Sequence, residues 1–366
     1  MTKTIQSTPK SDGFRMPGEF EKHQGTWMLW PERTDTWRSG AKPAQKAFAE
    51  VAKAIIPYEP VTVGVNAGQF EQARASLPAE VRVIEMSSND AWMRDIGTIF
   101  VVNDHGDIRG VDWRFNAWGG LDEGLYFPWD QDMLVKQKML EIEQIDRYDA
   151  SEFVMEGGAI AVDGEGTLIT TEQCVLNNNR NAHLSKKEME EKFSDYLNIE
   201  KVIWLKHGLV GDETDGHVDE VLFYIGPGEV AIGWTDNPNH VQYAVLHEVY
   251  NTLKNEVDAK GRPLKIHKIE LPEQIQLDEA ESSEIDFSPE AFERTADNTF
   301  IATYINCYLC NGAVILPAFN DPQDEIAKEQ FQHIFPDREI VQVYTREVSV
   351  GGGNIHCITQ QQPAVY

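Results

Sequence analysis

Five stretches of the chain place apolar residues at intervals of three and four. In the first stretch, Ala44, Ala47, Phe48 and Val51 fall on one side of a helix, because 3.6 residues complete each turn. Polar residues take most of the other positions, so each stretch predicts an amphipathic helix with one buried face. The predicted helices span residues 44–55, 131–145, 185–197, 241–257 and 324–335.

Between these stretches, each short apolar run leads to a short polar or glycine-rich segment, here called a switch, and a β-hairpin usually follows. The hairpin turns contain Gly, Asn or Asp, as at Asn311-Gly312. The strands of five such units are predicted at residues 81–86 and 98–102, 153–155 and 159–162, 202–205 and 221–225, 300–304 and 314–316, and 340–344. A unit that recurs in this way predicts an α/β fold of repeated modules around one axis rather than a doubly wound sheet.

Four of the switches carry side chains that can take part in chemistry. They are Asp95, Glu156, His217 with Asp219, and Cys357, which occupy similar places in four different modules. His217 and Asp219 are one residue apart on a predicted strand, so both should face the same side. Each residue alone has an ordinary structural explanation, such as a surface pair or a turn. Their co-occurrence favours function, because a closed ring of modules would bring all of them to its centre.

The length and charge of the chain limit the classes of protein it can belong to. With 366 residues, it is either two domains or one closed repeat architecture, and 41% hydrophobic residues are enough for a packed core. The 60 acidic and 32 basic residues give a net charge of −28, which repels phosphate backbones and anionic lipid surfaces. Nucleic acid and membrane are therefore poor candidates as partners, whereas a cation would be attracted.

No feature directs the chain to a membrane or to an oxidising compartment. Residues 1–20 lack the apolar run of a secretory signal, and no segment approaches the ~20 apolar residues of a membrane helix. Four cysteines are too few for a disulfide scaffold. Cys307 and Cys310 form a C-x-x-C in a predicted strand, with no second pair for zinc and no following helix, so core packing is favoured. We expect a cytoplasmic protein.

Cys357 differs from the other cysteines because it closely follows three glycines, in Gly351-Gly-Gly-Asn-Ile-His-Cys357. Glycine lets a backbone pack closely against another group, since it lacks a Cβ and tolerates positive φ. A cysteine with a distant histidine and several acids is typical of enzymes with a thiolate nucleophile, although an inert buried thiol is the simpler alternative. The segment around His217 could also bind a metal, but one local histidine without paired cysteines does not support Zn²⁺.

Long and specific motifs span essentially the whole chain, and they lie at residues 12–21, 27–31, 89–95, 115–120, 126–132, 156–158, 216–219 and 351–361. These motifs resemble those of the agmatine deiminases, a family of the guanidine-modifying (pentein) superfamily. The resemblance implies a five-bladed α/β propeller of ββαβ modules with pseudo-fivefold symmetry, forming one catalytic domain over residues 1–366.

The same resemblance implies hydrolysis of agmatine to N-carbamoylputrescine and ammonia, without a metal ion or an organic cofactor. A small cationic substrate agrees with the acidic composition. The chain departs from the family pattern where Ile96-Gly97-Thr98 replaces Cys-Gly-Pro, and where Asp215 replaces an Asn. Neither position is assigned to chemistry, although Asp215 adds charge near the site. The oligomeric state stays open, and a homo-oligomer is compatible with the sequence.

The chemistry of a guanidinium explains these residue types. Asp95 and Asp219 can each bind a pair of N–H groups on this planar cation and fix its central carbon before the nucleophile. Cys357 adds to that carbon as a thiolate. His217 then protonates the departing ammonia and next activates the water that hydrolyses the amidino-cysteine (thiouronium) intermediate. Glu156 is expected to accept a hydrogen bond from His217 and raise its pKa. The resemblance assigns the same roles to these positions.

The choice of substrate depends on the far end of the pocket. Agmatine is arginine without its carboxylate, so its pocket needs an acid for the terminal ammonium and no arginine side chain that would clamp a carboxylate. By resemblance, that acid is Glu213. Trp92 and Trp118 would line the aliphatic stem or contact the cation, although tryptophans are more often core residues.

Alternative functions remain open at this point. An arginine deiminase or an amidinotransferase would differ only at the mouth of the pocket. A papain-type protease or a transglutaminase also uses Cys and His, but it explains neither the acid-bearing switches nor the charge. A non-enzymatic acidic binding protein would leave Cys357 unreactive.

Overall fold

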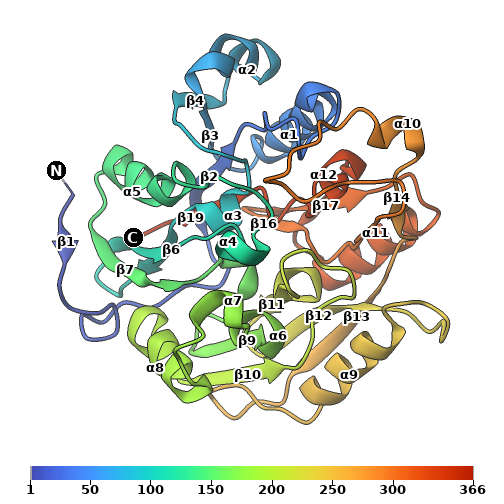
Figure 1. Cartoon of the computed structure of the whole chain (residues 1–366). Helices are drawn as coiled ribbons and strands as arrows, with labels where there is room; N and C mark the ends of the chain where they lie inside the picture. Colours follow the sequence, from blue (N-terminus) through green and yellow to red (C-terminus); the bar gives the residue numbers. More distant parts are fainter. Residues whose placement is uncertain (1, 366) are drawn as a thin grey trace.

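A computed structural model describes residues 2–365 as a mixed α/β protein. Its five longest helices lie at the periphery, with strands nearer the centre (Figure 1). They are α1 (Lys42–Ile55), α5 (Asp132–Glu143), α8 (Lys186–Leu197), α9 (Tyr243–Leu253) and α11 (Gln323–Ile334). These are the helices that the apolar spacing predicts, and the largest difference is the end of α9 at Leu253 rather than Val257.

Four sheets share one pairing pattern, in which an antiparallel hairpin is followed by a helix and then by a parallel strand. Their strands are β5 (Ile99–Val102), β6 (Ile108–Arg114) and β7 (Arg147–Val154); β8 (Ala161–Val162), β9 (Thr167–Thr171) and β10 (Lys201–Leu205); β11 (Leu222–Gly226), β12 (Glu229–Trp234) and β13 (Lys265–Glu270); and β16 (Tyr308–Cys310), β17 (Ala313–Ala318) and β18 (Glu339–Tyr344). The ββαβ order agrees with the repeated modules that the sequence predicts.

A fifth sheet follows the same pattern but joins the two ends of the chain. Strand β19 (Gln360–Pro363) pairs antiparallel with β2 (His23–Leu29), and β2 pairs in parallel with β3 (Val61–Val65) beyond α1. Strand β4 (Arg82–Glu85) extends this sheet after α2 (Phe70–Ser76). The C-terminal segment that carries Cys357 is therefore fixed against the N-terminal part of the chain.

Shorter elements complete the described chain. They are β1 (Thr4–Ile5), β14 (Ile275–Gln276), β15 (Thr299–Phe300), α3 (Met93–Ile96), α4 (Gly120–Glu123), α6 (Glu172–Val175), α7 (Asn178–Asn181), α10 (Glu279–Ser282), α12 (Arg346–Val350) and the 3-10 helices η1 (Ser39–Ala41), η2 (Ala67–Gln69), η3 (Gly157–Ala159) and η4 (Val218–Glu220). The strand predicted at 300–304 is wrong beyond Phe300, because β15 pairs only with β14 and the chain then turns toward Asn306. Within residues 2–365, no helix has the length and apolar character needed to cross a bilayer.

Local chemistry explains where the helices begin and end. Ser185 caps α8 by accepting a hydrogen bond from the N–H of Glu188, whose side chain accepts one from the N–H of Ser185. Asn198 ends the same helix in the left-handed region, with a φ of 60°. Pro43 lies in the first turn of α1, where its missing N–H removes no helical hydrogen bond.

The chemically competent residues lie where the chain passes from one sheet to the next. Asp95 lies between β4 and β5, and Glu156 lies between β7 and β8. His217 and Asp219 lie between β10 and β11, and Cys357 lies between β18 and β19. Each of these residues therefore lies between the last strand of one sheet and the first strand of the next, as their equivalent places in the predicted modules suggest.

Candidate active site

Cys357 lies in a turn between α12 and β19, and it is buried. Its N–H donates to Oδ1 of Asn306 at 3.3 Å, and its carbonyl accepts from the N–H of Arg94 at 3.0 Å. The sulfur lies 3.6 Å from Oδ2 of Asp219 and 3.7 Å from Oε1 of Glu220. Burial, together with these carboxylates, raises the pKa of Cys357 well above its usual value. The free protein therefore holds Cys357 as a thiol.

The glycines before Cys357 allow the close approach that the sequence predicts. A Cβ at Gly353 would lie 2.8 Å from the ring of Trp92 and 2.9 Å from the sulfur of Cys357. A Cβ at Gly352 would lie 2.5 Å from Oε2 of Glu213, and the φ of Gly352 is 109°. Only glycine therefore leaves room at both positions.

Asp95 lies in α3 with both carboxylate oxygens held by donors. Oδ1 accepts from the N–H of Gly158 at 2.8 Å, and Oδ2 accepts from Nε1 of Trp118 at 2.9 Å. The buried Lys136 of α5 donates to the carbonyls of Asp95 and Ile96, both at 2.9 Å, and so satisfies the end of the short helix. Burial is the main reason why the pKa of Asp95 is raised. A cation beside this carboxylate would reverse that effect.

Asp219 lies in η4 and has one carboxylate oxygen without a partner. Oδ2 is 2.8 Å from Nδ1 of His356, whereas Oδ1 is buried and bonds to no group among residues 2–365. His356 in turn contacts Oε2 of Glu19 at 2.8 Å, and Glu19 pairs with Arg94 at 3.2 Å. Burial opposes the charge on Asp219, but His356 outweighs it and lowers the pKa of this carboxyl. Oδ1 is thus an ionised, unsatisfied acceptor inside the protein.

His217 precedes η4, so the predicted strand at this position is wrong. A 3-10 turn at Val218–Glu220 replaces it, and it still brings His217 and Asp219 together. Nδ1 of His217 lies 3.9 Å from Oδ2 of Asp95 and 4.0 Å from Oδ1 of Asp219. Burial works against protonation of the ring, yet the charge of Asp95 and other neighbours raises its pKa well above the usual value. His217 is therefore a proton donor in the free protein.

Glu156 binds Arg180 rather than His217. Its Oε1 accepts from Nε of Arg180 at 2.7 Å, and both side chains are almost completely buried. The expected hydrogen bond from His217 is absent from the contacts of the described residues, although Glu156 and His217 bring oxygen and nitrogen atoms within 4.8 Å. Arg180 also binds Oδ2 of Asp215 at 3.0 Å. The departure at Asp215 therefore contributes to an ion pair instead of adding an unbalanced charge.

Glu213 is not the free acid that the sequence predicts. Nη1 and Nη2 of Arg294 bind its two carboxylate oxygens at 2.6 and 2.7 Å. Arg294 lies 81 residues away in the sequence, in an irregular segment, and is 6% exposed. The expectation of a pocket without an arginine is thus wrong, because the long loop before β15 brings one back to Glu213.

A small cavity, with about 20 Å³ of room for water-sized molecules, lies beside the nucleophile. It is lined by residues that include Asp95, Cys357 and Glu213, with Trp92 and Trp118 on its walls. The indole of Trp118 contacts that of Trp92 edge to face at 6.4 Å. A second cavity, with about 50 Å³ of such room, borders Asp219, Glu19 and His356 but not the nucleophile, so the lining residues rather than the size of the cavity identify the site.

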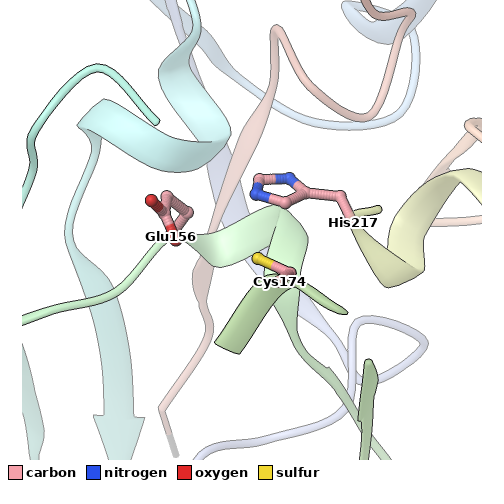
Figure 2. A group of neighbouring side chains, drawn as sticks. All are labelled: Glu156, Cys174 and His217. Carbon is pink, nitrogen blue, oxygen red and sulfur yellow. The ribbon is translucent and has the colours of Figure 1, made fainter. Parts of the chain in front are cut away.

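Two groups of buried side chains bring metal-ligand atoms within 4.8 Å of one another. They are Glu156 with Cys174 and His217, shown in Figure 2, and Asp219 with Glu220 and Cys357. We assign neither to a metal. In the first group Arg180 already binds Glu156 and would repel a cation, and in the second His356 occupies Asp219.

Sequence reasoning missed several residues of the site. Asn306 and His356 contact Cys357 and Asp219, Arg180 and Arg294 bind the two glutamates, and Cys174 lies beside His217. His356 directly precedes Cys357, and Asn306 is a polar residue in an apolar run, so both could have been noticed. The other three are distant in sequence, and no local signal identifies them.

Comparison with known proteins decides the family. The model of the Porphyromonas-type peptidyl-arginine deiminases matches residues 15–363. An agmatine deiminase of Pseudomonas aeruginosa strain LESB58 is 53% identical over 359 residues, covering 98% of each chain. The chain belongs to the Porphyromonas-type peptidyl-arginine deiminase family, among the agmatine deiminases. The resemblance seen in its motifs is therefore confirmed, and the family is one of hydrolases.

Solved structures agree on the fold. The structure of agmatine deiminase of Enterococcus faecalis catalysing its reaction superposes with a TM-score of 0.97, at 52% identity and with 100% of both chains covered. A substrate-bound agmatine deiminase of C. jejuni gives a TM-score of 0.82 at 24% identity, over 96% of this chain and 97% of that one. The latter likeness supports the fold alone.

Proposed function

We propose that this protein hydrolyses agmatine to N-carbamoylputrescine and ammonia through a covalent amidino-cysteine (thiouronium) intermediate on Cys357. The observation that carries the proposal is the carboxylate of Asp219, whose Oδ2 lies 3.6 Å from the sulfur of Cys357 and whose buried Oδ1 has no hydrogen-bond partner among the described residues. The agmatine deiminases of P. aeruginosa and E. faecalis, more than half identical over nearly the full length, support the same substrate.

The guanidinium of the substrate binds between Asp95 and Asp219. Oδ1 of Asp219 accepts one N–H, and each oxygen of Asp95 has a lone pair left beyond its single donor. Charge-assisted bonds of this kind hold the planar cation in one orientation. The positive charge also compensates the carboxylates that keep Cys357 protonated, so substrate binding lowers the pKa of the thiol and favours the thiolate.

The first half-reaction breaks a C–N bond. The thiolate of Cys357 adds to the guanidinium carbon, and His217 gives its proton to one amino group, which leaves as ammonia. The C–S bond stays, the amidino cation is linked to sulfur, and His217 is left neutral. Because its pKa is raised, His217 carries the proton that this step needs.

The second half-reaction releases the product. Neutral His217 takes a proton from water, and the resulting hydroxide adds to the amidino carbon. The thiolate of Cys357 then leaves with the electron pair of the C–S bond, and it recovers the hydroxyl proton as the carbamoyl group forms and the product departs. His217 ends in its protonated form, and the proton that the thiol lost to solvent on substrate binding is taken up by the released ammonia. Glu156, held by Arg180, lies within 4.8 Å of a ring nitrogen of His217 without bonding to it.

The terminal ammonium of agmatine reaches Glu213 and shares this carboxylate with Arg294. The aliphatic stem lies against Trp92 and Trp118, which line the cavity together with Cys357 and Glu213. Arg294 is the one observation that favours a carboxylate-bearing substrate such as arginine. However, its Nη1 and Nη2 already bind Glu213, and Nη2 also donates to the carbonyl of Gly351 at 2.7 Å.

We further propose that the five ββαβ sheets form a closed five-bladed propeller with pseudo-fivefold symmetry, and that residues 1–366 act as one catalytic domain. The common pairing pattern and the joining of β19 to β2 support a closed arrangement. The positions of Asp95, Glu156, His217 and Cys357 between consecutive sheets support an axis that passes through the site.

Ammonia release from agmatine, arginine and a peptidyl-arginine substrate, measured side by side, tests the function. We expect agmatine to give the highest kcat/KM. Intact-mass spectrometry after an acid quench should show an amidino adduct that disappears in Cys357→Ala. A higher kcat/KM for arginine, or an adduct on another residue, would contradict the proposal.

A further inference from the structure

The two nitrogens of the His217 ring face different surroundings. Nδ1 is directed toward Asp95 and Asp219, at 3.9 and 4.0 Å. Nε2 is buried and has no hydrogen-bond partner among residues 2–365, although the whole residue is only 1% exposed. Figure 2 shows one ring nitrogen directed toward Glu156, with the sulfur of Cys174 below the ring. A buried N–H without a partner is costly, so the group that faces Nε2 matters.

Cys174 is held in place beside this ring. It lies in α6, is completely buried, and brings its sulfur within 4.8 Å of a nitrogen of His217. Oγ1 of Thr171 accepts from the N–H of Cys174 at 3.2 Å and donates to the carbonyl of Gly216 at 2.7 Å. A single threonine therefore ties the start of α6 to the backbone just before His217. The main chain of Cys174 is therefore held next to the segment that carries His217.

We propose that the thiol of Cys174 is the positioning partner of Nε2 of His217. This inference rests on the proposed function, in which His217 is protonated in the first half-reaction and neutral in the second. A thiol is both a weak donor and a weak acceptor. It can accept the N–H of the imidazolium and then donate its S–H to the neutral ring. A carboxylate at the same place would strongly favour the charged form, and Glu156 is instead engaged by Arg180.

The charges around the ring are consistent with this role. Burial raises the pKa of Cys174, so it is a thiol rather than a thiolate. Burial also opposes protonation of His217, whereas Asp95, Cys174 and Asp219 favour it. The titratable and charged groups that face or surround the ring are Asp95 in α3, Glu156 before η3, Cys174 in α6, Arg180 in α7, Asp212 before η4, Asp219 and Glu220 in η4, and Cys357. The sulfur of Cys174 lies within 4.8 Å of a ring nitrogen of His217, and Cys174 belongs to no ion pair among the described residues, so its thiol is available to the ring.

Three substitutions separate hydrogen bonding from packing. Cys174→Val fills the space of the thiol without a polar atom, Cys174→Ala leaves a small cavity, and Cys174→Ser keeps a donor and acceptor. The pH dependence of kcat on agmatine is the activity readout. We expect Val and Ala to move the alkaline limb to lower pH by about half a unit or more, because the imidazolium loses an acceptor. Ser should keep a limb closer to that of the wild type.

A direct titration of His217 by side-chain ¹⁵N NMR in the full-length protein provides a readout independent of activity. We expect a higher pKa for His217 in the wild type than in Cys174→Val. Thermal unfolding curves check that both proteins are folded. A pH profile of kcat that matches the wild type in Cys174→Val but is shifted in Cys174→Ser would show that Cys174 acts by packing alone, and it would overturn the proposal. Identical His217 titrations in the wild type and in Val would also overturn it. If the wild type fails to turn over agmatine, the proposed function fails, while the NMR titration still decides whether Cys174 partners the ring.

Discussion

Arg294 holds Glu213 by a two-pronged ion pair, with Nη1–Oε1 at 2.6 Å and Nη2–Oε2 at 2.7 Å. The side chains of Arg294 and Glu213 are only 3% and 10% exposed, so water screens the pair little. The far end of the cavity therefore presents a carboxylate whose charge is already balanced. An incoming ammonium must share it with a guanidinium.

The first prediction concerns this shared carboxylate. Arg294→Gln should free Glu213 and lower the KM for agmatine relative to a short alkylguanidine that lacks the ammonium. Glu213→Gln should raise the agmatine KM about tenfold or more, since hydrogen bonds to charged groups contribute roughly 1.5–3 kcal/mol. Steady-state kinetics on both substrates is the measurement. Equal changes on the two substrates would mean that Glu213 does not contact the ammonium.

Glu213 also shows where sequence reasoning stops. By resemblance, Glu213 is predicted to be the acid at the far end of the site, and it lines the cavity that contains Asp95 and Cys357. Its partner Arg294 lies in a segment without regular structure, and no periodicity or turn pattern predicts where such a segment returns. Likewise, the spacing of apolar residues predicts the five long helices, because burial of one helix face constrains sequence strongly. The 3-10 turn at Val218–Glu220 involves too few residues to leave such a pattern.

The second prediction concerns the nucleophile. Cys357→Ala should lower kcat for ammonia release by about 10⁴-fold or more, as loss of the nucleophile does in other enzymes with a covalent intermediate. The reason is that Cys357 forms the bond to the substrate carbon. Cys307→Ala and Cys310→Ala are the controls, since both thiols are buried in the core and lie outside the cavity lining. They should keep most of the activity and lose some stability. Iodoacetamide labelling that agmatine suppresses in the wild type, and that is missing in Cys357→Ala, would complete the measurement.

The third prediction separates binding from chemistry at Asp219. In a Cys357→Ala background, Asp219→Asn should weaken agmatine binding about tenfold to a hundredfold, measured by calorimetry, because Oδ1 loses its charge toward the guanidinium. His356 can still donate to the amide oxygen of Asn, so the fold should persist. Unchanged affinity would remove Asp219 from the substrate site.

The fourth prediction concerns stability and pH at Glu19, which binds His356 and Arg94. Burial opposes its ionisation, but these two cations lower its pKa from 4.5 to about 2. A carboxyl with a lowered folded-state pKa stabilises the fold above its unfolded pKa, and this stabilisation disappears as the pH falls from 4.5 toward 2. A shift of that size corresponds to about 3 kcal/mol. Glu19→Gln should therefore destabilise the protein near pH 7, by urea unfolding, and differ much less from the wild type near pH 3. A difference that stays constant between these pH values would contradict the ion-pair account.

The fifth prediction tests the glycine that separates Trp92 from the nucleophile. A Cβ at Gly353 would lie 2.8 Å from the Trp92 ring and 2.9 Å from the sulfur of Cys357, closer than side-chain atoms approach one another. Gly353→Ala must therefore shift the indole, the sulfur or the turn, and a displacement near 1 Å can cost about a hundredfold in rate. Gly68→Ala is the matched control, because Gly68 has a negative φ and no atom within 4 Å of the added Cβ. We expect Gly353→Ala to lose most of its kcat, with an unfolding temperature that drops far less than the activity, while Gly68→Ala matches the wild type in both. Full activity in Gly353→Ala would show that the sulfur and Trp92 need not lie where the structure places them.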